Sequence, residues 1–181
     1  MIYVLLLRGI NVGGKNKVNM TDLKSILNGF GFLNVKSYIN SGNLFFDSEF
    51  KHEKIVKILS EILKENYDFK INFSILSKYE FNNDYNYLPK WWNDDLARKD
   101  VLFFNIGLEK NDVKKYINQL ELNNEIVHYG KNAIFWGKYD EENYLNTSYH
   151  KYLLKAPFYK EVTIRNGKTY NKIHDMINEE F

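Results

Sequence analysis

Hydrophobic residues recur along the chain with two different periods, and their order constrains the fold more than any other feature. Residues 2–7, IYVLLL, form a short continuous apolar run, which favours a buried strand. Residues 23–30 place apolar side chains three and four positions apart, the spacing of one helix face. In residues 35–40, Val35, Ser37 and Ile39 alternate with Lys36, Tyr38 and Asn40, as expected for a strand with two distinct faces.

The next segments complete a unit of six elements. Residues 41–43, SGN, have turn chemistry, and the apolar residues 44–46 predict the returning strand of a hairpin. Residues 55–63 predict a second amphipathic helix, and residues 71–75 alternate as a further strand. The order is therefore β-α-β-β-α-β, which is the ferredoxin-like or split βαβ arrangement.

The second half repeats this order in pattern, with little residue identity to the first. The expected elements are a strand at 101–106, a helix at 113–120, a hairpin at 126–129 and 133–136, a helix at 145–153, a strand at 162–164 and a helix at 170–177. The sequence thus predicts an α+β protein of two tandem ferredoxin-like (βαββαβ) units with mainly antiparallel sheets. We expect an N-terminal unit over residues 1–77, a connecting segment over 78–99 and a C-terminal unit over 100–181.

The relation between the two units is left open by the pattern. Four strands with helices on one face leave the other face free, so the units can associate face to face or edge to edge. Trp91 and Trp92 lie in the connecting segment. They either pack the seam between the units, which is the usual role of large aromatic residues, or line a ligand cleft there.

Composition excludes several classes of protein. The chain has no cysteine, which rules out disulfides and thiolate metal sites. It lacks an apolar run of ~20 residues and the features of a signal peptide, so we expect a soluble, cytoplasmic protein. The net charge of +2 is weak support for a nucleic-acid partner. The four histidines show no metal-ligand spacing, and no catalytic motif is present, so no metal is expected, while enzymatic activity, cofactors and catalytic residues stay undetermined.

A glycine-rich segment follows the first strand. Residues 9–15, GINVGGK, satisfy G-x-x-x-x-G-K, but Asn16 stands where a P-loop has Ser or Thr. The helix also begins several residues too late to face a phosphate, and a hairpin follows instead of a parallel strand. A nucleoside-triphosphate P-loop is therefore disfavoured.

A looser anion site remains a hypothesis for this loop. Successive backbone N–H groups in a glycine-rich turn form a concave nest for anions. Arg8 ends the preceding strand, and Lys15 and Lys17 add positive charge. The other interpretation is that the glycines only supply positive φ angles in a long connection.

Two further segments carry polar groups that suit the same site. The hairpin at residues 40–43 offers amides and a hydroxyl, and Tyr38 offers a phenol. Arg165 ends a strand in the second half, next to a helix start, which favours anions. Ordinary turn and capping chemistry explains these residues equally well. The candidate ligand-binding residues are Arg8, Gly9, Asn11, Gly13, Gly14, Lys15, Lys17, Tyr38, Ser41, Gly42, Asn43, Arg165, Asn166 and Thr169.

The segment RGINVGG at residues 8–14, followed by Tyr38 and SGN at 41–43, resembles the opening signature of the bacterial family known as domain of unknown function 1697. That family commonly has a T-x-R-N-W-x-T segment, and residues 163–169 are similar to it, with Gly167 in place of the Trp. The resemblance implies two ferredoxin-like units. It implies no reaction.

The sequence therefore supports one leading hypothesis and two alternatives. The first is a site for a small anionic ligand that carries phosphate or carboxylate, such as a nucleotide. The second is single-stranded nucleic-acid binding, with Tyr3, Tyr38, Phe45 and Phe46 as exposed stacking groups. The third is a protein-interaction module with Trp91 and Trp92 as its contact patch. The sequence does not show whether the basic segments meet, nor the oligomeric state.

Overall fold

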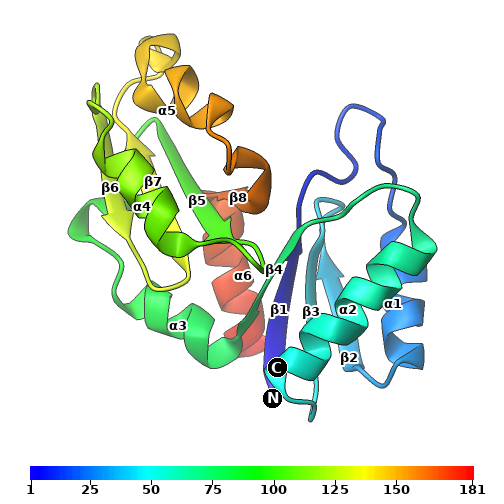
Figure 1. Cartoon of the computed structure of the whole chain (residues 1–181). Helices are drawn as coiled ribbons and strands as arrows, with labels where there is room; N and C mark the ends of the chain where they lie inside the picture. Colours follow the sequence, from blue (N-terminus) through cyan, green and yellow to red (C-terminus); the bar gives the residue numbers. More distant parts are fainter.

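The computed structural model describes residues 1–181 and has two four-stranded antiparallel sheets and six α-helices (Figure 1). The first sheet has the order β2-β3-β1-β4, from β1 (Ile2–Leu7), β2 (Leu33–Tyr38), β3 (Asn43–Asp47) and β4 (Phe73–Ser77). The second has the order β6-β7-β5-β8, from β5 (Arg98–Phe104), β6 (Glu125–Tyr129), β7 (Ala133–Lys138) and β8 (Val162–Asn166). The helices are α1 (Met20–Gly29), α2 (His52–Asn66), α3 (Lys78–Asn86), α4 (Lys110–Asn118), α5 (Ser148–Lys151) and α6 (Gly167–Glu179). None of the helices combines the length and the apolarity needed to cross a lipid bilayer.

The outer face of the first sheet is covered by α1 and α2 (Figure 1). Leu5 and Phe46 from the sheet pack in one core with Leu23, Ile55 and Leu59 from the two helices, and all five are fully buried. The helical residues belong to the three- and four-residue apolar spacing of the sequence, which places them on one face of each helix. This core fixes the first half of the molecule.

The inner faces of the two sheets share a central core. Val4 and Leu6 alternate with the outward-facing residues of β1 and pack in the same cluster as Phe103, Phe135 and Tyr170 of the second half. The helix α6 lies between the sheets in Figure 1. Neither inner face is therefore open to solvent. The two halves associate through a shared layer of buried hydrophobic side chains.

The edge strands β4 and β8 lie next to each other at the seam. The backbone N–H of Ile106 donates to the carbonyl oxygen of Phe73, at 3.0 Å. The amide oxygen of Asn105 accepts from the hydroxyls of Ser74, at 2.7 Å, and Thr163, at 2.6 Å. These contacts tie β4 and β8 to the segment that follows β5.

Two segments differ from the sequence expectation. The predicted connecting segment contains α3, which buries only Phe81 and Asp84 and so lacks an apolar stripe. Its start has a capping box between Ser77 and Glu80, a signal that the sequence does contain. The helix expected over 145–153 is interrupted because Thr147 adopts an extended conformation and caps α5 with its side chain. Short 3₁₀ turns flank α5 on both sides.

Candidate functional site

Arg165 joins the two halves of the molecule. It leaves β8, is only 8% exposed, and reaches the hairpin between β2 and β3. Its Nε donates to the amide oxygen of Asn43, at 2.5 Å. Its Nη2 donates to the carbonyl oxygens of Leu7, Ser41 and Gly42, at 2.9, 2.8 and 3.2 Å. Two of the three segments proposed to form one site, which are far apart in the sequence, therefore meet in space.

The charge of this buried guanidinium has no carboxylate partner. Nη1 donates to the carbonyl oxygen of Ile164, at 2.9 Å, and none of the ion pairs in the protein includes Arg165 or Arg8. Burial, together with the smaller effect of the positive charge of Arg8, lowers the pKa of Arg165 to about 10. Arg165 stays cationic at pH 7, with only amide dipoles to compensate it.

Arg8 lies beside this guanidinium at the end of β1. Its side chain is half-buried, and its Cζ lies 4.8 Å from the centroid of the Tyr159 ring, which belongs to the second half. Arg8 forms neither an ion pair nor a side-chain hydrogen bond within the protein. The planar fork of Arg8 therefore keeps its donors free, at a place where two positive charges are close together.

The loop of residues 9–17 is fastened to the hairpin by Asn11. The amide nitrogen of Asn11 donates to the carbonyl oxygens of Val18, at 2.9 Å, and Asn40, at 2.7 Å. Its amide oxygen accepts from the backbone N–H of Val18, at 2.9 Å. The side chain of Asn11 is thus fully used in holding the loop, which leaves the backbone of the loop as its available donor surface.

The three glycines of the loop are needed for their positive φ angles, because a side chain at each position would have room. Gly9, Gly13 and Gly14 have φ angles of 67°, 58° and 74°, and a Cβ at each would meet no atom within 4 Å. Their backbone N–H groups form no hydrogen bond within the protein. Lys15 and Lys17 are exposed on the same loop. The glycines therefore supply the positive φ angles of the loop, as one interpretation of the sequence expected. Their N–H groups are also free to bind an anion.

The hairpin has a different role, because its residues are bonded to the protein. Gly42 has φ 80°, and a Cβ there would lie 2.7 Å from Cβ of Leu7. Asn43 is fully buried, and its amide nitrogen donates to the carbonyl oxygen of Tyr38 and to Oγ of Ser41. Tyr38 itself packs against the central core. These residues hold the backbone carbonyls and the amide that receive Arg165.

Asn166 and Thr169 lie at the start of α6. The amide oxygen of Asn166 accepts from the backbone N–H of Thr169, at 2.8 Å, and so caps the helix. Asn166 also lines a separate cavity of about 660 Å³ with Trp92 and Lys168, and no residue of the 9–17 loop reaches it. The capping interpretation of Asn166 is confirmed.

The aromatic residues proposed for nucleic-acid stacking are not available for it. Tyr3 and Phe46 are buried in the core of the first half and Phe45 in the central core, so the prediction of an open stacking face is wrong for them. Trp91 and Trp92 are also buried, and Nε1 of Trp92 donates to the amide oxygen of Asn171. Both Trp residues pack in the central cluster, and Trp92 also lines the cavity of about 660 Å³ described above.

A buried ion pair lies away from this seam. Nζ of Lys138 is 2.5 Å from Oδ2 of Asp100 and 3.4 Å from the centroid of the Tyr149 ring. Burial lowers the pKa of Lys138, and the charge of Asp100 opposes that shift. The pair sits under the segment that carries α5 and serves packing of the second sheet. No group of three His, Cys, Asp or Glu side chains is placed to hold a metal ion.

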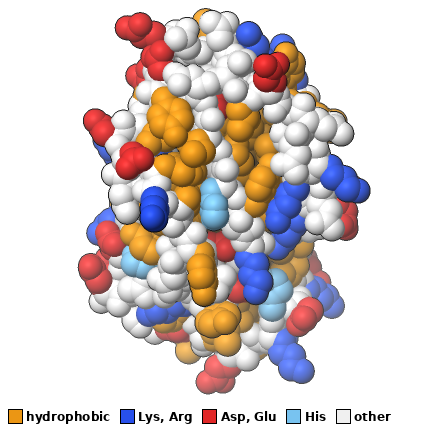
Figure 2. Space-filling model, turned by 90° about the vertical axis from the view of Figure 1, so that its left-hand side faces the viewer, with side chains coloured by type: hydrophobic (Ala, Val, Ile, Leu, Met, Phe, Trp, Pro, Cys, Tyr) orange, Lys and Arg blue, Asp and Glu red, His pale blue; other side chains and the backbone are white.

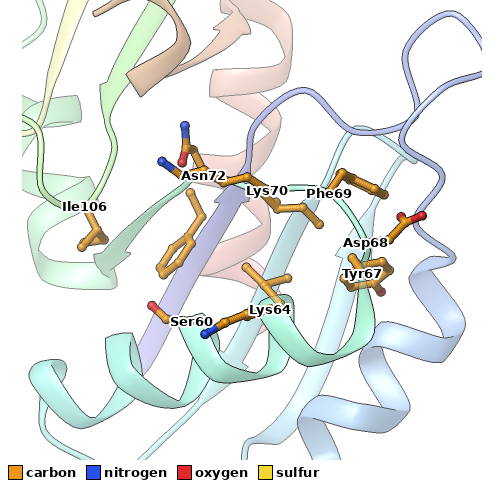
Figure 3. Close-up of a pocket in the computed structure, with 11 residues that line it drawn as sticks. Ser60, Lys64, Tyr67, Asp68, Phe69, Lys70, Asn72 and Ile106 are labelled. Carbon is orange, nitrogen blue, oxygen red and sulfur yellow. The ribbon is translucent and has the colours of Figure 1, made fainter.

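Two other surface features lie outside the proposed site. A cavity of about 540 Å³ is formed by α2, the segment before β4 and Ile106, with Lys64, Asp68 and Lys70 around it (Figure 3). Hydrophobic side chains gather on the face of the second half in Figure 2, with both basic and acidic groups around them. Neither feature presents a continuous basic band of the kind that a nucleic acid requires.

Fold and site define a protein of mixed α+β class whose two sheets are locked together by an arginine at their seam. The chain belongs to the family described as Protein of unknown function (DUF1697), whose model matches residues 1–135. It is also similar to a solved structure, the conserved bacterial protein SP0830 from Streptococcus pneumoniae. The two share 49% sequence identity over 97% of this chain and 98% of the other, with a TM-score of 0.94. No curated protein matches the chain.

Proposed function

We propose that the chain consists of two tandem ferredoxin-like units, residues 1–77 and 100–181, joined by the segment 78–99, which carries α3. The equivalent strand orders of the two sheets support this division, because in each sheet the first strand of the unit lies between the third and the fourth. A cytoplasmic location is part of the same proposal, since a chain without cysteine suits a reducing compartment.

We propose further that the seam binds a small anionic ligand that carries phosphate or carboxylate, such as a nucleotide. The observation that carries the proposal is that the buried Arg165 donates to the carbonyl oxygen of Leu7, the residue before Arg8, and that neither arginine has a carboxylate partner. An anion at this place relieves the repulsion between them. A bidentate hydrogen bond from Arg8 is the strongest single contact that the site offers.

The candidate residues then divide into two groups. Arg8 contacts the anion, the free N–H groups of Gly9, Gly13 and Gly14 close around it, and Lys15 and Lys17 raise the local positive potential. Arg165 is a positioning residue, because its donors already bind protein oxygens. The residues that hold the loop and the hairpin in place are Asn11, Tyr38, Ser41, Gly42 and Asn43.

The test is a titration of the ¹⁵N-labelled protein with inorganic phosphate, followed by backbone amide shifts. We expect saturable shifts at Gly9, Gly13 and Gly14, which Arg8→Met abolishes. The matched control is Arg98→Met, because Arg98 also stacks on a tyrosine, with Cζ 4.7 Å from the Tyr144 ring centroid, but lies away from the loop. Shifts that are equal in wild type and Arg8→Met, or no shifts at all, contradict the proposal.

A further inference from the structure

A small cavity lies on the other side of the seam, between β4 and the segment that follows β5. Its volume is about 190 Å³, and apolar side chains that include Ile75 and Phe104 form much of its wall. Five polar or charged side chains line it as well, and these are His52, Glu80, Asn105, Lys110 and Asn132. The cavity contains none of the residues of the loop 9–17, so it is separate from the site proposed above.

One buried donor in this cavity has no partner. Asn105 is 5% exposed, and its amide oxygen accepts from the hydroxyls of Ser74 and Thr163. Because both hydroxyls point at the oxygen, the amide nitrogen points away from them, and it donates to no protein atom. An unpaired buried donor is unfavourable, so a ligand oxygen at this place forms a hydrogen bond that the protein lacks.

Two helix N-termini converge on the same cavity. His52 is the first residue of α2 and Lys110 is the first residue of α4, and neither helix has a side-chain cap. The helices α1, α3, α5 and α6 are all capped by side chains. The first N–H groups of an uncapped helix carry partial positive charge and need acceptors. The free N–H groups at the starts of α2 and α4, like the unpaired amide nitrogen of Asn105, therefore favour a ligand oxygen in the cavity.

We propose that this cavity binds a small monocarboxylate with a short aliphatic chain. The donors of Asn105, Lys110 and the two helix starts suit the carboxylate, and the apolar wall suits the chain. Glu80 lines the same wall, and its negative charge disfavours a doubly charged phosphate. A wider groove of about 570 Å³ shares His52, Glu80, Lys110 and Asn132 with the cavity and gives the ligand a route from solvent.

The experiment is a titration of the ¹⁵N-labelled full chain with butyrate, acetate and inorganic phosphate at millimolar concentrations. We expect butyrate to shift the side-chain amide of Asn105 and the backbone amides at the starts of α2 and α4. Lys110→Met keeps the aliphatic stem near the Phe104 ring and removes the charge, so butyrate affinity falls about tenfold. Lys114→Met, one turn further along α4, is the control and leaves the affinity unchanged.

Several results overturn this inference. They are the absence of any butyrate shift at the Asn105 amide, an equal or stronger response to phosphate there, and an affinity that Lys110→Met does not change. The inference and the proposed anion site fail separately, because Arg8→Met leaves butyrate binding intact while it abolishes the phosphate response of the glycine loop.

Discussion

At the scale of single residues, Arg8 and Arg165 have different roles at the seam. The chain has three, and Arg8 and Arg165 both end strands that lead toward glycines. The same sequence context gives them opposite roles, since Arg165 donates only to protein oxygens and Arg8 to none of them. The difference is that Arg165 is buried against the hairpin at residues 41–43, more than 100 residues away in the sequence. The residues next to Arg165 in the sequence do not reveal that contact.

Arg165 is expected to stabilise the folded state through hydrogen bonds that no other side chain can replace. Arg165→Met leaves Oδ1 of Asn43 and the carbonyl oxygen of Ser41 without their donor. Hydrogen bonds to a charged group contribute about 1.5–3 kcal/mol each, and the relief of charge burial offsets part of that sum, so we expect a net loss of about 3 kcal/mol.

Urea unfolding, followed by tryptophan fluorescence, measures this change. Arg165→Lys is expected to recover little, because an ammonium cannot reach oxygens in several directions of one plane. Arg98→Met serves as the surface control. A midpoint for Arg165→Met that equals that of the wild type would show that the seam does not depend on this side chain.

At the scale of secondary-structure elements, α3 shows where pattern analysis misses a helix. Only Phe81 and Asp84 of α3 are buried, so the sequence shows no apolar residues at helical spacing there. The capping box of Ser77 and Glu80 is the one sequence signal of its start. Its buried polar group, Asp84, accepts the backbone N–H groups of Lys131 and Asn132, both at 2.8 Å. A single carboxylate thus ties α3 to the turn between β6 and β7.

Asp84→Asn tests this tie through its pH dependence. Burial raises the pKa of Asp84, and the hydrogen bonds to Lys131 and Asn132 oppose that shift. The folded protein then binds a proton at Asp84 more tightly than the unfolded chain does. The stability that comes from this proton is present at low pH and is lost as the pH rises through the folded pKa. The Asn variant lacks this term.

We therefore expect Asp84→Asn to lower the free energy of unfolding by about 2 kcal/mol, because one of the two N–H groups loses its acceptor. The deficit relative to the wild type is expected to be larger near pH 4 than near pH 7. Urea unfolding of both proteins at the two pH values measures it, with Asp95→Asn on the exposed surface as the control. A deficit that grows with pH is the opposite sign and rejects the assignment.

At the scale of the whole molecule, the sequence predicted the eight strands in their order along the chain, but it missed α3 and did not show how the two sheets meet. Periodicity identifies which side chains are apolar and which face they share, but it does not name their partners. The run IYVLLL did carry one usable signal, because a strand that is apolar on both faces is expected to be covered on both. The same limit applies to the site, since the proximity of Arg8 to Arg165 depends on how the halves pack.

The shared core predicts that the two halves unfold together. Leu76 belongs to the first sheet but packs in the central cluster with residues of the second half. Leu76→Ala is expected to lower stability by about 2–5 kcal/mol, as in other buried leucine truncations. All three tryptophans lie between residues 91 and 136, so their fluorescence reports the second half. In Leu76→Ala, the urea midpoint followed by tryptophan fluorescence should fall as far as the midpoint followed by NMR signals of first-half backbone amides. The control Leu145→Ala, at an exposed residue, should change neither midpoint.

The central claim is that the fork of Arg8 holds an anion at the seam. Crystals soaked in selenate, an oxyanion with the shape of sulfate and with strong anomalous scattering, test it most directly. We expect an anomalous peak within hydrogen-bond distance of the Arg8 guanidinium and of the N–H groups of Gly13 or Gly14. Selenate bound only at other surfaces, with the Arg8 fork bare at the same soak concentration, would contradict the claim.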